Sequence, residues 1–109
     1  MLCFSIVVPV YNESKNIINL INEIYDQDLQ NYNFETIFVD DRSTDTSLSI
    51  LKSIDKNNFR YIVNKKNLGQ SHSIYNGIKV AKYDTIVTLD GDGQNDPKDI
   101  LILLKYFFK

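Results

Sequence analysis

The segment Thr85–Pro97, with the sequence TIVTLDGDGQNDP, combines a strand, a sharp turn and the start of a helix. Its first five residues, Thr85–Leu89, are apolar or β-branched, which favours a buried strand. The turn is Asp-Gly-Asp-Gly at positions 90–93, and Asp96 then provides a helix cap directly before a proline. We therefore predict a strand at Thr85–Leu89 that leads through an acidic loop into a helix at Pro97–Phe108.

The same order of strand, polar turn and helix occurs three more times before this segment. Apolar runs predict strands at Leu2–Val10, Phe34–Val39 and Phe59–Val63. Helical spacing and capping residues predict helices at Ile17–Tyr25, from a cap at Ser43 or Thr44 through Ile54, and at Gly69–Ala81. Because these units follow one another without a hairpin signal, we predict an α/β fold. It has a mainly parallel sheet of about four strands with helices on both faces.

The composition of the 109-residue chain limits its function classes. It contains 12 Lys and Arg residues and 14 Asp and Glu residues. The resulting net charge of −2 argues against nucleic acid as a partner. With 43% hydrophobic and 24% charged residues it is typical of one globular domain, which we place at residues 1–109. Cys3 has no second cysteine to pair with, so it is predicted to be a core thiol in a reducing compartment.

Neither end of the chain carries a predicted membrane segment. The apolar start lacks a basic n-region and a small-residue cleavage site, which argues against a signal peptide. The apolar residues 100–108 are far fewer than the roughly 20 that a membrane span needs. A cytoplasmic location is therefore predicted.

Three polar clusters directly follow predicted strands. They are Tyr-Asn-Glu at 11–13, Asp-Asp-Arg-Ser at 40–43 and Asp-Gly-Asp at 90–92. In a parallel sheet the carboxyl ends of the strands meet at one edge, and ligands bind outside that edge. We therefore expect these clusters to share one site.

Asp90 and Asp92 are spaced so that both carboxylates can meet one hard cation. Mg²⁺ and Mn²⁺ prefer oxygen ligands and are commonly held by one or two carboxylates together with substrate phosphates. Gln94 could supply a neutral oxygen, and Gly91 and Gly93 would let the backbone approach a ligand closely. The alternative is a plain turn, for which Asp and Gly are common residues.

The other two clusters have features of a nucleoside site. A carboxylate such as Asp41 can accept hydrogen bonds from a base or a ribose, Glu13 can meet ribose hydroxyls, and Tyr11 offers a ring face to a base. The alternatives are helix capping after the second strand and a solvated loop around Glu13. Asp40 and Asp41 could also form a paired-acid Mg²⁺ site of the kind found in receiver domains.

Taken in order, these segments resemble the family 2 glycosyltransferases of the GT-A fold. The similar segments are Val8–Glu13, Val39–Asp45, Asn67–Gln70 and Leu89–Pro97, and the match runs from about Ser5 to the C-terminus. The last segment is most similar to the dolichyl- or polyprenyl-phosphate sugar transferases.

The resemblance implies transfer of a sugar from a UDP- or GDP-linked donor to a polyprenyl phosphate, with Mg²⁺ or Mn²⁺. By position, the base and ribose contacts are Pro9, Tyr11, Glu13 and Asp41, and the donor and metal site is Asp90, Gly91 and Asp92, with Gln94 lining it. The metal ligands are then Asp90, Asp92 and Gln94.

The chain departs from the family in two respects. The family usually has Gly where Arg42 stands, so either the turn after Asp41 differs or Arg42 reaches a phosphate. Family catalytic domains are also longer, and their acceptor-side residues and any catalytic base lie beyond the point that corresponds to Lys109. The chain therefore resembles the N-terminal, nucleotide-sugar-binding half of such a domain, and no catalytic base is identified.

Three interpretations of the function remain open. The chain can be a transferase that associates peripherally with the cytoplasmic face of a membrane. It can be a non-catalytic nucleotide-sugar-binding fragment or subunit that pairs with a second half or with another copy of itself. It can also be a Mg²⁺-dependent receiver- or phosphatase-like domain. His72 is expected on the surface or in the packing of its helix, and Lys65 and Lys66 in a solvated loop.

Overall fold

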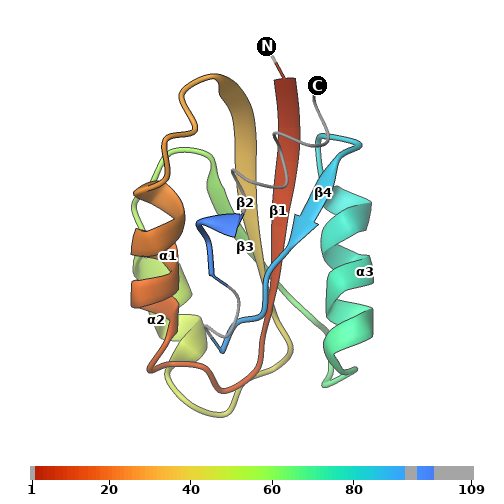
Figure 1. Ribbon diagram of the computed structural model, residues 1–109. Coiled ribbons are helices and arrows are strands. Elements are labelled where there is room, and N and C mark those ends of the chain that lie inside the picture. Colours follow the sequence, from red (N-terminus) through yellow and green to blue (C-terminus); the bar gives the residue numbers. More distant parts are fainter. Residues whose placement is uncertain (1, 93–95, 100–109) are drawn as a thin grey trace.

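The computed structural model describes residues 2–92 and 96–99. Within these ranges, four strands alternate with three helices (Figure 1). They are β1 (Leu2–Val10), α1 (Ile17–Tyr25), β2 (Tyr32–Asp40), α2 (Ser47–Ser53), β3 (Phe59–Val63), α3 (Gln70–Val80) and β4 (Ile86–Thr88). The last predicted helix, Pro97–Phe108, falls almost entirely outside the described residues. No helix in the described ranges is long and apolar enough to cross a membrane.

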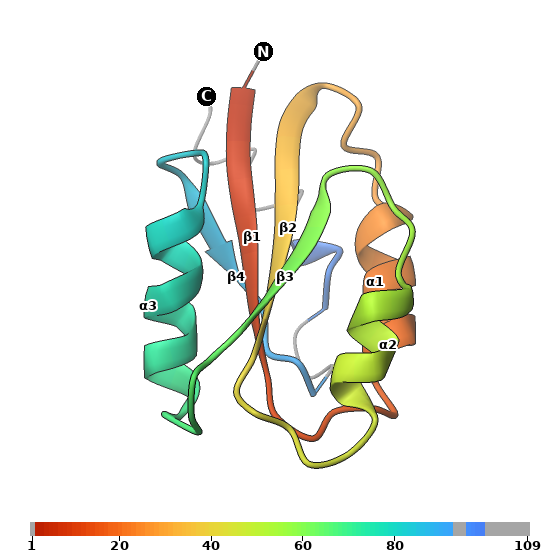
Figure 2. The same cartoon turned by 180° about the vertical axis from the view of Figure 1, so that it is seen from behind.

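The four described strands form one parallel sheet in the order β3-β2-β1-β4. Helices α1 and α2 lie on one face and α3 lies on the other (Figures 1 and 2). Since the strands run in the same direction, their carboxyl ends meet at one edge, at the bottom of Figure 1. The predicted α/β architecture is confirmed.

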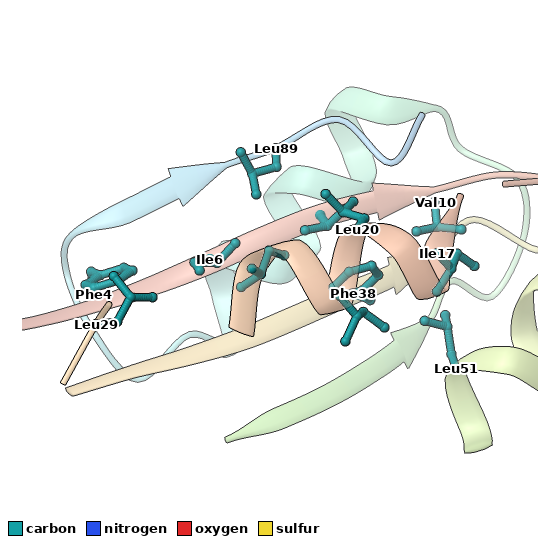
Figure 3. Packing of buried hydrophobic residues seen from close by; sticks show 12 residues of the cluster. Phe4, Ile6, Val10, Ile17, Leu20, Leu29, Phe38, Leu51 and Leu89 are labelled. Atoms are coloured by element: carbon teal, nitrogen blue, oxygen red, sulfur yellow. The ribbon is translucent and has the colours of Figure 1, made fainter. Parts of the chain in front are cut away.

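The larger core lies between the sheet and α1 (Figure 3). Helix α1 buries Ile17, Leu20, Ile21 and Ile24, whose spacing places them on one face of the helix. They pack with strand residues such as Phe38, which is fully buried. Each buried side chain of this kind contributes roughly 1.5–3 kcal/mol relative to exposure to water, so α1 is held mainly by its packing.

Helix α3 approaches the opposite face of the sheet closely at Gly77. A Cβ atom added there would lie 2.5 Å from Cγ1 of Val7 and 3.1 Å from Cγ2 of Val39. Both neighbours are stiff β-branched side chains in the smaller core on this face. Glycine at position 77 therefore sets how near α3 can sit to β1 and β2.

The prediction that Ser43 or Thr44 caps the second helix is wrong. Helix α2 begins at Ser47, whose backbone N–H donates to Oδ1 of Asp45 at 2.8 Å. The backbone N–H groups of Thr44 and Asp45 instead donate to Oδ1 of Asn12, at 2.8 and 3.3 Å. Asn12, which is distant in sequence, thus accepts hydrogen bonds from the backbone N–H groups that a helix starting at Ser43 or Thr44 would leave for a capping residue.

Cys3 also differs from its prediction as a core thiol, because it is only partly buried near the start of β1. The core of β1 begins one residue later, at Phe4.

Glu35 is a buried carboxylate of β2, near the amino ends of β3 and β4, that the sequence analysis did not single out. Its Oε2 accepts hydrogen bonds from Oγ of Ser5 at 2.7 Å and from the backbone N–H of Lys82 at 2.5 Å. Its Oε1 accepts from Nε of Arg60 at 3.2 Å and forms an ion pair with the same guanidinium. Burial acts to raise the pKa of Glu35, but these hydrogen bonds and the Arg60 charge outweigh it, so that the pKa lies below its usual value.

Candidate functional site

A cavity of about 370 Å³ opens where the strands end. It brings together seven residues that the sequence analysis selected: Pro9, Tyr11, Glu13, Asp41, Asp90, Gly91 and Asp92. The eighth, Gln94, lies outside the described residues. The cavity is also lined by Val10, Gln70 and Ser73, which the sequence analysis did not propose as site residues. The expectation that the polar clusters meet at one edge agrees with this geometry, while their roles in binding stay predictions.

Asp41 is a buried residue that lines the cavity and holds the loop between β3 and α3. Its Oδ1 accepts hydrogen bonds from the backbone N–H of Leu68 at 2.8 Å and from Nδ2 of Asn64 at 2.9 Å. Its Oδ2 accepts one from the backbone N–H of Gly69, also at 2.8 Å. The carboxylate therefore fixes the segment that leads into α3, which capping of α2 would not require.

The same contacts set the charge of Asp41. Burial acts to raise the pKa of Asp41. The hydrogen bonds from Leu68, Asn64 and Gly69, together with the nearby His72, lower it by a larger amount, so that the pKa lies below the usual value. A carboxylate has about four acceptor positions, and these contacts fill three of them. An ionised Asp41 thus keeps acceptor capacity on the side that lines the cavity.

Asn12 joins the loop after β1 to the loop after β2. Besides accepting from the second loop through Oδ1, it donates its backbone N–H to Oγ of Ser43 at 2.9 Å and its side-chain amide to Oγ1 of Thr44 at 3.1 Å. Its φ of 53° lies in the left-handed region, which Asn adopts more readily than most residues. That tolerance was the only sequence signal for this role, because the partners are more than 30 residues away.

Tyr11 and Glu13 flank Asn12 on the cavity side. Tyr11 is 45% exposed, so its ring is available for stacking. The backbone N–H of Glu13 donates to Oγ of Ser47 at 3.0 Å, and its Oε2 accepts from Nδ2 of Asn16 at 2.8 Å. The carboxylate of Glu13 is thus oriented by the start of α1, which differs from the freely solvated loop considered above.

Gly91 is required by protein packing. A Cβ atom there would lie 2.6 Å from the carbonyl oxygen of Pro9 and 3.4 Å from Cγ2 of Val10. The predicted reason for this glycine, close approach of the backbone to a ligand, is therefore not the one seen, because the end of β1 occupies the space that a side chain would need. This contact holds the Asp90–Asp92 turn against β1.

The two carboxylates of the turn differ in their surroundings. Asp90 is partly buried, and its Oδ1 accepts a hydrogen bond from Nε2 of Gln70 at 3.0 Å. Asp92 is exposed at the cavity rim. Among the described residues, no three His, Cys, Asp or Glu side chains converge as a complete metal site. Two carboxylates at an open cavity nevertheless suit Mg²⁺ or Mn²⁺, because these ions commonly take their remaining ligands from phosphate and water.

The residues next to Asp41 shape the turn after β2. Asp40 is buried, and its carboxylate accepts hydrogen bonds from the backbone N–H of Ser43 at 3.2 Å and from Oγ of the same residue at 2.6 Å. These contacts disfavour a paired-acid metal site at 40 and 41. Arg42 is exposed and has a φ of 62°. It therefore adopts the left-handed conformation that a glycine would take easily.

The remaining candidates lie at the surface. His72 is exposed on α3, as expected, and Lys65 and Lys66 are exposed in the loop after β3.

Comparison with known proteins gives a consistent picture. Residues 5–109 match the family model described as "Glycosyl transferase family 2". The undecaprenyl-phosphate 4-deoxy-4-formamido-L-arabinose transferase of Pseudomonas fluorescens is 36% identical over 102 residues, which cover 90% of this chain and 30% of that protein. The chain thus spans about a third of the length of such curated relatives.

Solved structures with the same fold include two complexes with nucleotide sugars. TarS of S. aureus in complex with UDP-GlcNAc superposes with a TM-score of 0.80 at 29% identity, over 97% of this chain and 31% of that one. The mannosyltransferase PcManGT from Pyrobaculum calidifontis, in complex with GDP-Man and Mn²⁺, superposes with a TM-score of 0.82 at 23% identity, over 97% of this chain and 32% of that one. The similarity confirms the GT-A fold class.

Proposed function

Because the chain belongs to glycosyltransferase family 2, we propose that its cavity binds a nucleoside diphosphate sugar for transfer of the sugar to a polyprenyl phosphate. The observation that carries this proposal is the convergence of Asp41, Asp90 and Asp92 on one cavity at the carboxyl ends of the strands. Such an edge is where open α/β sheets bind their ligands.

The residues that line the cavity suit the two halves of a nucleotide-sugar donor. For the nucleoside, Tyr11 offers an exposed ring and Asp41 offers a charged acceptor held in place by its own hydrogen bonds. Glu13 lines the same cavity and would accept hydrogen bonds from ribose hydroxyls. UDP and GDP both present the N–H and O–H donors that such carboxylates accept.

The Asp90–Asp92 turn suits the diphosphate. Asp90 and Asp92 would repel phosphate unless a cation lay between them, and Mg²⁺ or Mn²⁺ is the ion that these two residues, with Gln94, would hold. When bound, the ion supplies Lewis-acid stabilisation of the departing diphosphate. Gln70 orients Asp90 through the hydrogen bond to Oδ1.

The acceptor proposal rests on the relatives. Their printed names include undecaprenyl phosphate as the molecule acted on. A phosphate monoester has a second pKa of about 6 and is largely dianionic at neutral pH. Such a nucleophile needs little help from a general base, so donor binding and orientation are the main tasks of this chain.

The transfer itself is proposed to require a further segment or subunit, because the chain corresponds to about a third of its curated relatives. A second half or another copy of the chain would supply the acceptor side, at the cytoplasmic face of a membrane. A nucleotide-sugar-binding subunit without activity of its own is the second candidate, favoured by the same coverage.

Calorimetric titration of the 109-residue chain with UDP and with GDP tests the proposal. Binding is expected with Mn²⁺ and is expected to disappear when the ion is chelated. Asp92→Asn should abolish this metal-dependent binding without unfolding the chain, because Asp92 is exposed. Asp55→Asn, another exposed Asp far from the cavity in the sequence, is the matched control and should bind normally. A folded chain that binds neither nucleotide, or full binding by Asp92→Asn, would refute the proposal.

A further inference from the structure

A second hollow, distinct from the donor cavity, lies between β3 and α3. It has a volume of about 600 Å³. Its apolar lining comes from Ile62 and Val63 at the end of β3, Leu68 in the following loop, and Val80 at the end of α3. Strand β3 is one of the two outer strands of the described sheet, and in Figure 2 it crosses the near side of the molecule towards α3. We call this hollow the β3–α3 groove.

The rim of the β3–α3 groove is positively charged. Lys65, Lys66 and Lys79 line it, and none of the described residues that line it is acidic. The whole chain has a net charge of −2, so this is a local concentration of positive charge on an otherwise acidic molecule. Lysines clustered in this way attract anionic groups, phosphate among them.

The surface around the groove is apolar as well. Val63 is 37% exposed, Val80 is 39% exposed and Tyr75 is 59% exposed. Nζ of Lys79 lies 5.2 Å from the centre of the Tyr75 ring, so the ring and a rim charge share one part of the surface. Exposed aromatic and aliphatic side chains next to lysines are typical of segments that lie in a membrane interface.

We propose that the β3–α3 groove is a membrane-binding surface for anionic phospholipids. The lysine rim would meet the lipid phosphates while Val63, Val80 and Tyr75 enter the apolar part of the interface. An acidic peptide could satisfy the lysines, but its charged side chains would leave the apolar lining and the Tyr75 ring without matching contacts. An anionic lipid surface satisfies both features.

The groove and the donor cavity share one loop. Leu68 and Asn64 line the groove, and both donate hydrogen bonds to Asp41 in the cavity. A chain bound through the groove would therefore keep the donor cavity next to the membrane. This inference does not depend on donor binding, so its failure and that of the proposed function can be told apart.

Co-sedimentation of the 109-residue chain with vesicles tests the proposal. One set of vesicles contains equal parts of phosphatidylcholine and phosphatidylglycerol, and the other contains phosphatidylcholine alone. Binding is expected only to the first set and should weaken as salt is added. Each juxtaposed lysine contributes about a fivefold gain in binding to an anionic surface, so the combined variant Lys65→Gln, Lys66→Gln, Lys79→Gln should bind about a hundredfold more weakly.

The matched control removes three exposed lysines elsewhere, in the combined variant Lys15→Gln, Lys52→Gln, Lys56→Gln. It has the same net charge as the groove variant and should keep most of the binding. Tyr75→Ser keeps the charge and should bind about tenfold more weakly, because it removes an apolar contact.

Three results would overturn the proposal. They are equal loss in the two lysine variants, absence of binding to anionic vesicles, and tight binding of a polyglutamate peptide in place of vesicles. The last result would assign the groove to an acidic protein.

Discussion

Asp41 and Glu35 are buried carboxylates in the same part of the chain, and they act at opposite ends of the sheet. Glu35 collects donors from Ser5, Arg60 and Lys82 and so joins β1, β2, β3 and the turn before β4. Asp41 collects its donors from a single loop, between β3 and α3, and lines a cavity. Both have a lowered pKa, so both are charged at neutral pH.

The difference lies in what each carboxylate leaves unused. Glu35 is surrounded by protein donors, one of them a guanidinium, so its charge is neutralised within the fold. Asp41 is held by neutral backbone and amide groups and keeps acceptor capacity towards the cavity. Burial and a shifted pKa therefore do not by themselves identify a site, whereas a charge that also lines an open cavity marks a candidate site.

The largest expected effect separates the two carboxylates by stability. Glu35→Gln should lower the free energy of unfolding by about 3 kcal/mol, because it leaves buried donors without a charged acceptor. Arg60→Gln should cost only about 1 kcal/mol, since the Arg60 side chain is 41% exposed and can be hydrated. Urea unfolding followed by circular dichroism measures both values. Equal costs would mean that the ion pair matters more than the hydrogen bonds to Glu35.

Lowering the pH should reduce the difference in stability between the unmodified chain and Glu35→Gln. Glu35 and Asp41 have folded pKa values below the ordinary values of 4.5 and 3.8. Each carboxylate therefore stabilises the fold at pH values above its ordinary pKa. That stabilisation is lost as the pH falls below those values through the lower folded pKa. At pH values below about 4, the urea concentration at the unfolding midpoint of the unmodified chain should therefore decrease and approach the midpoint of Glu35→Gln. A constant gap down to pH 2 would contradict this assignment.

Asp41→Asn should affect both folding and ligand binding. Replacing the charged acceptor is expected to cost about 2 kcal/mol of stability and to weaken nucleotide binding about tenfold. Glu35→Gln, measured by calorimetry under conditions where it is folded, should bind nucleotide as the unmodified chain does. Similar loss of affinity in both variants would show that the two ends of the sheet are not independent.

A variant at Gln70 tests whether the hydrogen bond from Gln70 positions the carboxylate of Asp90. Gln70→Ala removes the hydrogen bond to Asp90 and should weaken metal-dependent nucleotide binding about fivefold, with a stability change within about 0.5 kcal/mol. Ser71→Ala, at the exposed neighbouring position, is the control. If calorimetry gives the same affinity for both variants, Gln70 does not position Asp90.

The smallest expected effect concerns the turn after Asp41. Arg42→Gly relieves the left-handed conformation, worth roughly 1 kcal/mol, but adds freedom to the unfolded chain, so a net gain of about 0.5 kcal/mol is expected. Arg42→Ala should bring no such gain, because alanine is strained there as well. Thermal unfolding of the two variants side by side measures the difference, and a more stable Ala variant would contradict the assignment of strain.

The architecture was predictable because the strands contain apolar runs and α1 carries a regular apolar face. Helix α3 is different, since it buries Ser73 and Gly77 and exposes most of its larger apolar residues. The cavity was predictable for a related reason, since parallel strands bring their carboxyl ends together whatever the details of packing. The residues that were missed act through partners far away in sequence. Asn12 reaches Thr44, and Glu35 reaches Lys82.

Glu35 did leave a signal, as a charged residue inside an otherwise apolar strand. Its partners, however, depend on which strands become neighbours. The misplaced start of α2 has a similar origin, because local capping rules do not include Asn12.

The pairing of β1 has a consequence for synthesis. Strand β1 emerges from the ribosome before the other described strands, and it pairs with β2 on one side and with β4 on the other. The β4 partners, Ile86–Thr88, are made more than 70 residues after β1 ends at Val10. At 5–20 residues per second, one side of this apolar strand waits roughly 4–15 s for its neighbour. A nascent chain therefore exposes one edge of this apolar strand throughout that interval, and during it the chain is a natural client for chaperones.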